Sequence, residues 1–147
     1  MKGLIQRVSQ ASVVVDGETV GAINHGILLL LGVEKDDNPE KASKLLDKVL
    51  RYRIFSDDNS KMNLSLTDIG GELLIVSQFT LVADTRKGLR PSFSSGASPA
   101  LGEELYNQFV ELARHKHDHD KIACGRFAAD MKISLLNDGP VTFMLEV

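Results

Sequence analysis

A buried strand that ends in polar side chains, within residues 72–83, constrains the fold of this chain more than any other feature. Residues 73–76 form an unbroken apolar run of strand length, followed by Ser77, Gln78 and Thr80 interleaved with apolar residues. An unsatisfied buried hydroxyl or amide costs about 1 to 3 kcal/mol, so these three side chains need polar partners. Either they bond to neighbouring loops and end the strand, or they meet a polar ligand.

The length of 147 residues fits a single domain spanning 1–147. Cys124 is the only cysteine, which excludes an internal disulfide, and no signal-peptide pattern precedes the first strand-like segment, so we expect a reducing cytoplasm. No apolar run approaches the roughly 18 residues of a membrane span, and no membrane partner is expected. The net charge of −3 removes overall basicity as evidence for nucleic-acid binding, so local clusters of positive charge decide that question.

Most of the chain carries the pattern of β-strands joined by short turns. Residues 11–15 and 18–23 flank Asp16-Gly17, a two-residue signal for a β-hairpin. Residues 27–33 contain four consecutive leucines, which suits a strand covered on both faces. Segments 53–55 and 62–66 are two candidate antiparallel partners of the central strand at 73–76. Further strand patterns lie at residues 1–8, 133–136 and 141–147.

Two helices are predicted, each by an N-cap residue followed by proline. Asn38-Pro39 and Ser98-Pro99 supply these starts. The apolar residues that follow at helical spacing are Ala42, Leu45, Leu46, Val49 and Leu50 in one helix, and Leu101, Leu105, Phe109 and Leu112 in the other. The predicted fold class is therefore α+β: a layered β/β/α domain, mostly of antiparallel strands, with two main helices covering one face.

One loop concentrates positive charge after the central strand. Arg86, Lys87 and Arg90 lie within ten residues of one another, together with Gly88 and Phe93. Such a loop is consistent with phosphate binding and equally with a solvated charge cluster.

Two other features are weaker candidates for chemistry. His115, His117 and His119 resemble metal ligands by residue type, but alternate residues at a helix end point in different directions, and zinc sites draw ligands from separate elements. Cys124 follows two apolar residues, which is typical of a buried thiol. No serine-hydrolase elbow, glycine-rich phosphate loop or zinc-helix motif is present, so neither a metal nor another cofactor is expected.

Two motifs nevertheless resemble a known family. Ser77-Gln78-Phe79-Thr80-Leu81 and Asn137-Asp138-Gly139-Pro140-Val141-Thr142 are similar to the two signature motifs of D-aminoacyl-tRNA deacylases, also called D-tyrosyl-tRNA deacylases. Nearly the whole chain is covered, and the other segments in register are residues 4–8, 32–34, 52–55, 61–63, 90–93 and 127–131. The histidine-rich string belongs to neither motif.

The resemblance implies an enzyme that hydrolyses the ester joining a D-amino acid to the 3′-terminal adenosine of tRNA, and that also accepts glycyl-tRNA. It implies that Ser77, Gln78, Phe79 and Thr80 hold the scissile carbonyl and the adenosine, with backbone N–H groups near Gln78 and Phe79 as oxyanion donors. An aminoacyl ester is already labile, so oxyanion stabilisation and positioning suffice without a catalytic triad. Direct attack by Thr80 or Ser77 stays open, but neither hydroxyl has an evident base, which favours the ribose 2′-hydroxyl and a bound water.

The resemblance further implies that Gly139-Pro140 is a cis dipeptide that sorts chirality by steric rejection of L-aminoacyl esters. In that reading the chain is a homodimer, and Gly139 and Pro140 face the active site of the partner across a two-fold axis. Arg7 is then the candidate for a hydrogen bond that holds the dipeptide.

The basic loop, finally, is expected to bind acceptor-stem phosphates of tRNA. Two alternatives remain: a non-catalytic RNA-binding accessory module that uses this loop, and a thiol or metal hydrolase built on Cys124 or the histidines.

Overall fold

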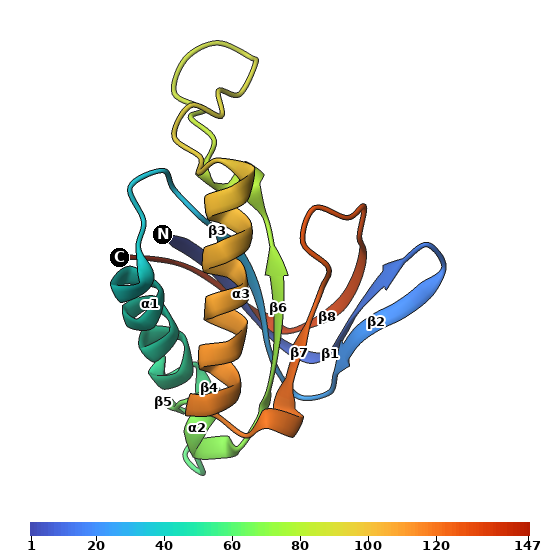
Figure 1. Ribbon diagram of the computed structural model, residues 1–147. Coiled ribbons are helices and arrows are strands. Elements are labelled where there is room, and N and C mark those ends of the chain that lie inside the picture. Colours follow the sequence, from blue (N-terminus) through green and yellow to red (C-terminus); the bar gives the residue numbers. More distant parts are fainter.

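In the computed structural model, which describes residues 1–147, the two long strands β1 (Lys2–Val15) and β8 (Lys132–Glu146) pair antiparallel along most of their length (Figure 1). On its other side β1 pairs first with β3 (Gly26–Gly32) and then with β2 (Glu18–Ile23). The predicted hairpin between β1 and β2 is confirmed. Asp16 and Gly17 have φ of 49° and 80°, as a type I′ turn requires.

The expected antiparallel partners of the central strand were wrong. That strand is β6 (Glu72–Ser77), and it runs parallel to both its neighbours, β3 and β7 (Ile122–Cys124). The expected partners form β4 (Phe55–Ser56) and β5 (Met62–Leu64), which pair only with each other in a separate two-stranded sheet. The physical reason is connectivity, since parallel neighbours require a long crossover and helical segments supply one on each side of β6.

These crossovers place the two main helices, α1 (Pro39–Arg51) and α3 (Pro99–Lys116), together over one face of the sheet (Figure 1). Both predicted N-caps are confirmed: the Asn38 side chain accepts the Lys41 N–H at 3.0 Å, and the Ser98 side chain accepts the Leu101 N–H at 3.3 Å. Three short elements were not predicted, namely α2 (Leu66–Ile69) and the 3₁₀-helices η1 (Phe79–Val82) and η2 (His119–Lys121). No helix combines the length and apolarity that crossing a membrane demands.

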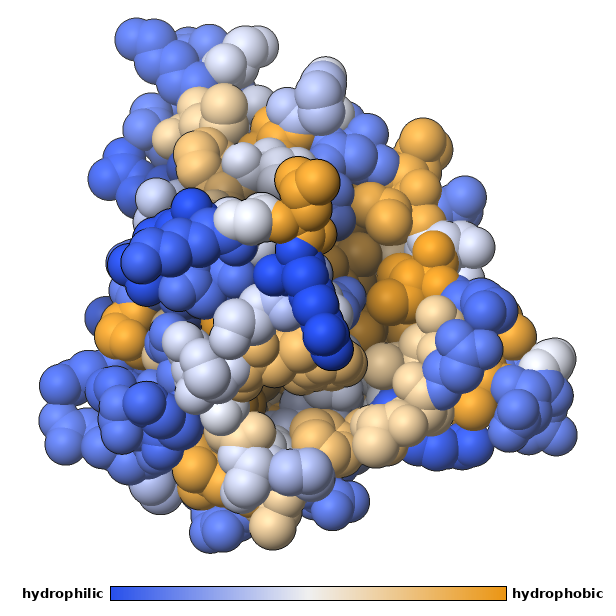
Figure 2. All heavy atoms as spheres, turned by 90° about the horizontal axis from the view of Figure 1, so that it is seen from above, coloured by the Kyte–Doolittle hydropathy of each residue, from blue (hydrophilic) through white to orange (hydrophobic).

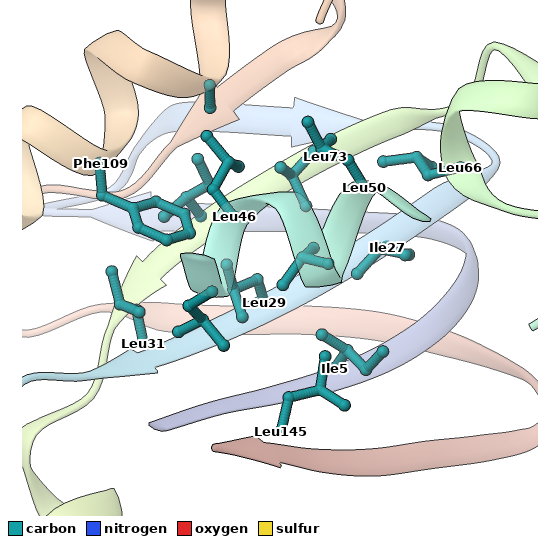
Figure 3. Packing of buried hydrophobic residues seen from close by; sticks show 14 of the residues in the cluster. Ile5, Ile27, Leu29, Leu31, Leu46, Leu50, Leu66, Leu73, Phe109 and Leu145 are labelled. Carbon is teal, nitrogen blue, oxygen red and sulfur yellow. The ribbon is translucent and has the colours of Figure 1, made fainter. Parts of the chain in front are cut away.

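The core lies on both sides of the sheet. Leu73 and Ile75 of β6 belong to the large cluster under the helices, which Figure 3 shows around Phe109 and Leu46, whereas Leu74 and Val76 belong to a smaller cluster on the opposite face. Residues 73–76 are all fully buried. The buried strand predicted at residues 73–76 is therefore confirmed, and the structure shows that it is covered on both faces, so β6 is a rigid support for whatever follows its end.

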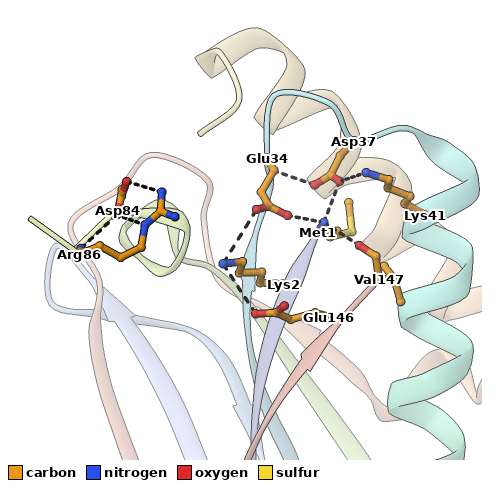
Figure 4. A network of polar contacts seen from close by, with 9 residues as sticks. All are labelled: Met1, Lys2, Glu34, Asp37, Lys41, Asp84, Arg86, Glu146 and Val147. Carbon is orange, nitrogen blue, oxygen red and sulfur yellow. Dashed lines mark hydrogen bonds and ion pairs between the residues drawn. The ribbon is translucent and has the colours of Figure 1, made fainter. Parts of the chain in front are cut away.

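A buried ion-pair network fixes the loop between β3 and α1. The α-ammonium of Met1 lies 2.7 Å from both Asp37 Oδ1 and Glu34 Oε2, and Asp37 Oδ2 accepts the Glu34 N–H at 2.7 Å (Figure 4). The Asp37 side chain is completely buried, and its carboxylate also pairs with Lys41 Nζ at 3.3 Å. The same loop accepts the Ala97 N–H at the carbonyl of Val33, 3.0 Å away, and so connects to the segment before α3.

Replacing Asp37 by asparagine is expected to lower the free energy of unfolding by about 3 to 5 kcal/mol, because it removes one counter-charge from a buried ammonium group. Chemical denaturation of the two proteins measures this difference. Glu40→Gln is the matched control, since it removes a carboxylate from an exposed pair with Lys44 in the same region and is expected to change stability little. Equal stability of Asp37→Asn and the parent protein would contradict the assignment.

Candidate active site

The polar residues at the end of β6 lie where the strand turns into η1. The Gln78 N–H donates to the carbonyl of Leu31 at 2.8 Å and so continues the parallel pairing with β3. The chain then enters η1, and the N–H groups of Phe79 and Thr80 are the first two of this helix, which have no acceptor within it. The Gln78 side chain folds over the turn, with Nε2 donating to Thr80 Oγ1 at 2.6 Å.

The backbone N–H groups near Gln78 and Phe79 are not equally available to a ligand. The Gln78 N–H is already used inside the sheet and is not available to a ligand. The N–H groups without a backbone acceptor at this turn are those of Phe79 and Thr80, at the start of η1.

A cavity of about 540 Å³ opens beside this strand end. Ser77, Gln78 and Phe79 line it, together with Leu31, Val33, Val76, Ala97, Ser98, Pro99, Gly102, Tyr106, Phe127, Ala128, Ala129, Asp130, Met131 and Ile133. The walls are mainly apolar, and the first turn of α3 forms part of them. A space-filling view of this end of the molecule shows hydrophobic residues gathered around a hollow, with hydrophilic residues at its rim (Figure 2). An apolar pocket with a few polar groups at one edge is the usual form of a small-ligand site.

The aromatic ring of Phe79 projects at the mouth of this cavity. Its side chain is two-thirds exposed, and its ring lies 5.2 Å from that of Phe93, centroid to centroid. Two neighbouring exposed rings offer a surface on which a planar base can stack.

Tyr106 of α3 is a wall residue that the sequence analysis missed. Its hydroxyl donates to the carbonyl of Ile75 at 3.0 Å and lies 3.4 Å from the carbonyl of Gly125, and burial raises its pKa well above the usual range. The hydroxyl thus stays protonated and ties α3 to β6 two residues before Ser77. A tyrosine on the apolar face of a predicted helix was the available signal, because a buried phenol requires an acceptor.

The second motif lies in β8, where the pairing with β1 is interrupted. Thr142 pairs with Gln6 and Asn137 pairs with Val8, so residues 138–141 stand opposite Arg7 alone. The Gly139-Pro140 peptide bond is cis, as expected. The expected contact of Arg7 is also present: Nε donates to the Asp138 carbonyl at 2.7 Å, and Nη1 donates to the Ile54 carbonyl at 2.7 Å.

Gly139 and Pro140 are exposed and do not line the cavity at Ser77 within the same chain. A single chain therefore does not bring the two motifs together.

The basic loop projects beyond the end of the sheet (Figure 1), and its three cations differ. Arg86 forms a two-pronged ion pair with Asp84, with distances of 2.9 and 2.8 Å, which holds the pKa of Asp84 well below its usual range (Figure 4). Lys87 and Arg90 are exposed and make no ion pair. Leu89, between them, is fully exposed.

The remaining candidates lie apart from the cavity. His117 Nε2 is 2.8 Å from the Gly71 carbonyl, His119 is largely exposed, and the structure gathers no group of three or more metal-ligating side chains. Cys124 is partly buried in β7, with Sγ 3.9 Å from an Arg114 nitrogen, and does not line the cavity.

Comparisons with known proteins agree along the whole chain. The family model described as D-Tyr-tRNA(Tyr) deacylase matches residues 4–146. A D-aminoacyl-tRNA deacylase of Pseudoalteromonas atlantica is 65% identical over 149 residues, which cover 100% of both chains. The solved structure of a c-Myc DNA Unwinding Element Binding Protein superposes with a TM-score of 0.96 at 39% identity, covering 100% of this chain and 99% of that one. A probable eukaryotic D-amino acid tRNA deacylase, 18% identical, shares the fold with a TM-score of 0.85 over 99% and 98% of the two chains.

Proposed function

The chain belongs to the D-Tyr-tRNA(Tyr) deacylase family, and from this membership we propose that it hydrolyses the ester bond of D-aminoacyl-tRNA to release the free D-amino acid and tRNA. One observation carries the proposal: Phe79, whose N–H has no acceptor at the start of η1, lines an apolar cavity together with Ser77 and Gln78, and the N–H of Thr80 follows it in the chain. This is the form of an oxyanion hole beside an aminoacyl pocket. Residues 1–147 act as one deacylase domain.

Catalysis in this proposal rests on oxyanion stabilisation. The carbonyl oxygen of the ester gains negative charge as water attacks, and the N–H groups of Phe79 and Thr80 stabilise this charge by donating hydrogen bonds to the oxygen. Removing one such donor from an enzyme typically costs a factor of about 10² to 10³ in rate, so two preorganised donors supply much of what a labile ester requires.

The nucleophile in this proposal is water assisted by the ribose 2′-hydroxyl of the terminal adenosine. Thr80 Oγ1 already accepts a hydrogen bond from an amide, Gln78 Nε2, which cannot act as a base. Neither the Ser77 hydroxyl nor the Thr80 hydroxyl has a hydrogen bond to a histidine or a carboxylate. An unactivated hydroxyl is a weak nucleophile, whereas the substrate brings its own hydroxyl next to the ester.

Chirality is selected, in this proposal, by Gly139 and Pro140 of a second copy. These two residues, here called the tip, are exposed. Exposed apolar side chains on the same strand support a homodimer that forms through β8; they are Leu135, Leu136, Phe143 and Met144. The tip backbone would collide with any side chain on the L face of the substrate α-carbon. A hydrogen there fits, so D-aminoacyl and glycyl esters are both accepted.

The proposal is tested by incubating the purified protein with matched D- and L-aminoacyl-tRNA and following loss of the ester. Rapid loss of the D-ester alone is expected, and it should persist with EDTA and after alkylation of Cys124. Binding of tRNA without ester loss would support the accessory RNA-binding module instead. Loss of activity with EDTA or alkylation, without unfolding, would support a metal or thiol hydrolase.

The basic loop is proposed to bind acceptor-stem phosphates through Lys87 and Arg90, while Arg86 shapes the loop through Asp84. Replacing Lys87 and Arg90 by alanine is expected to raise KM and to reduce the slope of log(kcat/KM) against log salt by about 1 to 2, because two phosphate contacts are lost.

The matched control for this loop variant neutralises Lys44 and Lys61, which are exposed elsewhere on the surface, and should leave the salt dependence unchanged. An unaltered slope in the loop variant would assign the loop to structure alone.

A further inference from the structure

The four residues 138–141 of β8, here called the bulge, stand opposite one residue of β1. A regular antiparallel pair matches residues one to one, and each match satisfies backbone N–H and carbonyl groups. An insertion of this size removes those partners from the bulge. Its backbone groups need other partners if the tip at Gly139 and Pro140 is to hold one position.

The Asn137 side chain supplies partners on the C-terminal side of the bulge. Its Oδ1 accepts the Val141 N–H at 2.7 Å, and its Nδ2 lies 3.3 Å from the Val141 carbonyl. Nδ2 also donates to Thr142 Oγ1 at 3.0 Å. The amide therefore replaces a missing strand edge, since it offers one acceptor and one donor to the same residue.

These contacts join the two ends of the bulge and fix its C-terminal side, which Arg7 does not contact. Arg7 holds the carbonyl of Asp138, on the N-terminal side of the tip. Val141 is buried and belongs to the large core cluster, so it is a fixed point. The Asn137 amide connects the start of the bulge to that fixed point, and the two residues at the tip lie between the two clamps.

We propose that Asn137 is a positioning residue for chiral selection: it sets the placement of the tip and thereby the rejection of L-aminoacyl esters. The inference rests on the proposed role of Gly139 and Pro140. Rejection by steric collision depends steeply on distance, so a small displacement of the tip admits an L side chain before it affects the D-ester. Residues 138–140 of the bulge are exposed, and only Val141 is buried.

The experiment compares Asn137→Ala and Asn137→Asp with the parent protein, using D-aminoacyl-, L-aminoacyl- and glycyl-tRNA. For Asn137→Ala we expect the ratio of kcat/KM for the D-ester to that for the L-ester to fall about tenfold or more, mainly through faster L-ester hydrolysis. Asn137→Asp keeps the acceptor for the Val141 N–H but loses both donors. Its D-to-L ratio of kcat/KM should therefore lie between that of the parent protein and that of Asn137→Ala. The hydrolysis rate of glycyl-tRNA should change little, because glycine presents no side chain to the tip.

Asn63→Ala is the matched control. Asn63 also donates and accepts through its side chain amide, to Asp57 and from Arg53, but in the separate β4–β5 sheet. Its selectivity ratio should equal that of the parent protein.

The outcomes separate the inference from the function on which it rests. If Asn137→Ala keeps the parent ratio, or slows both esters equally, or if both Asn137 variants fail to fold, the positioning role is wrong. If a substitution at Gly139 changes the ratio while those at Asn137 do not, only the role of Asn137 fails. If neither site changes it, the proposed selection by the tip fails as well.

Discussion

Removal of the 2′-hydroxyl from the terminal adenosine of the substrate is expected to slow ester hydrolysis by about a hundredfold or more, whereas Thr80→Val slows it less than about tenfold. The two effects differ because the proposal assigns the activation of water to the 2′-hydroxyl of the substrate and not to the Thr80 hydroxyl. Thr80 Oγ1 is engaged by Gln78 Nε2 and has no base beside it, while the 2′-hydroxyl lies next to the ester in the substrate itself. Thr80→Val also leaves the backbone N–H of residue 80 in place, so the oxyanion donors survive.

Single-turnover hydrolysis of D-aminoacyl-tRNA ending in adenosine or in 2′-deoxyadenosine measures the first effect, with the amino acid carried on the 3′-hydroxyl in both. The uncatalysed rates of the two esters provide the control, because the hydroxyl also affects the reaction in water. A loss of about a hundredfold in Thr80→Val, with little dependence on the 2′-hydroxyl, would identify Thr80 as the nucleophile.

Replacing Gly139 by alanine is expected to reduce the preference for D- over L-aminoacyl-tRNA by about a hundredfold or more, the scale on which enzymes discriminate by fit within one site. A Cβ at this position would lie 2.6 Å from both Val141 N and Val141 Cγ2, closer than side chains pack. Gly139 also has φ of 158°, where an L residue is strained. Because Val141 is anchored in the core, the tip itself must shift.

The measurement is the ratio of kcat/KM for matched D- and L-esters, together with sedimentation of the same samples. Asp138→Ala is the control: it keeps the carbonyl that Arg7 holds and removes only a carboxylate 3.7 Å from Arg7 Nε. Its ratio should remain close to that of the parent protein. The parent protein should sediment as a dimer, and a fully selective monomer would contradict selection by a partner's tip.

Local patterns in the sequence predicted the local structure. Asp16-Gly17 produced the expected hairpin turn, and Asn38 and Ser98 cap the helices that begin at Pro39 and Pro99. Each of these signals acts through hydrogen bonds or dihedral angles within a few residues, so its outcome depends little on the rest of the chain. The leucine run at residues 27–33 also predicted a strand covered on both faces, because a strand exposes alternate residues to opposite sides, and β3 is buried along almost all of its length.

The site was foreseen only in part, and mainly through its two motifs. Residue types alone left the strand end and the basic loop with two interpretations each. The cis Gly139-Pro140 bond was expected only from the resemblance, since X-Pro bonds in folded proteins are mostly trans. The position of Tyr106 on the apolar face of a predicted helix indicated that its hydroxyl needs an acceptor, but no pattern identified the Ile75 carbonyl as that acceptor or indicated that Asn137 bonds to Val141.

Only the tertiary structure decided which backbone groups are free and which cations are paired. Strand β7 lies more than forty residues after β6 in the chain and yet pairs with it in parallel. Neither segment's own sequence indicates this pairing. The Gln78 N–H donates to the carbonyl of Leu31, which leaves the N–H groups of Phe79 and Thr80 without a backbone acceptor. Arg86 pairs with Asp84, whereas Lys87 and Arg90 make no ion pair. In each case the sequence by itself determined the residue types and their local conformation. Their availability for chemistry was decided by contacts between segments distant in the chain, which form only when the whole sheet is assembled.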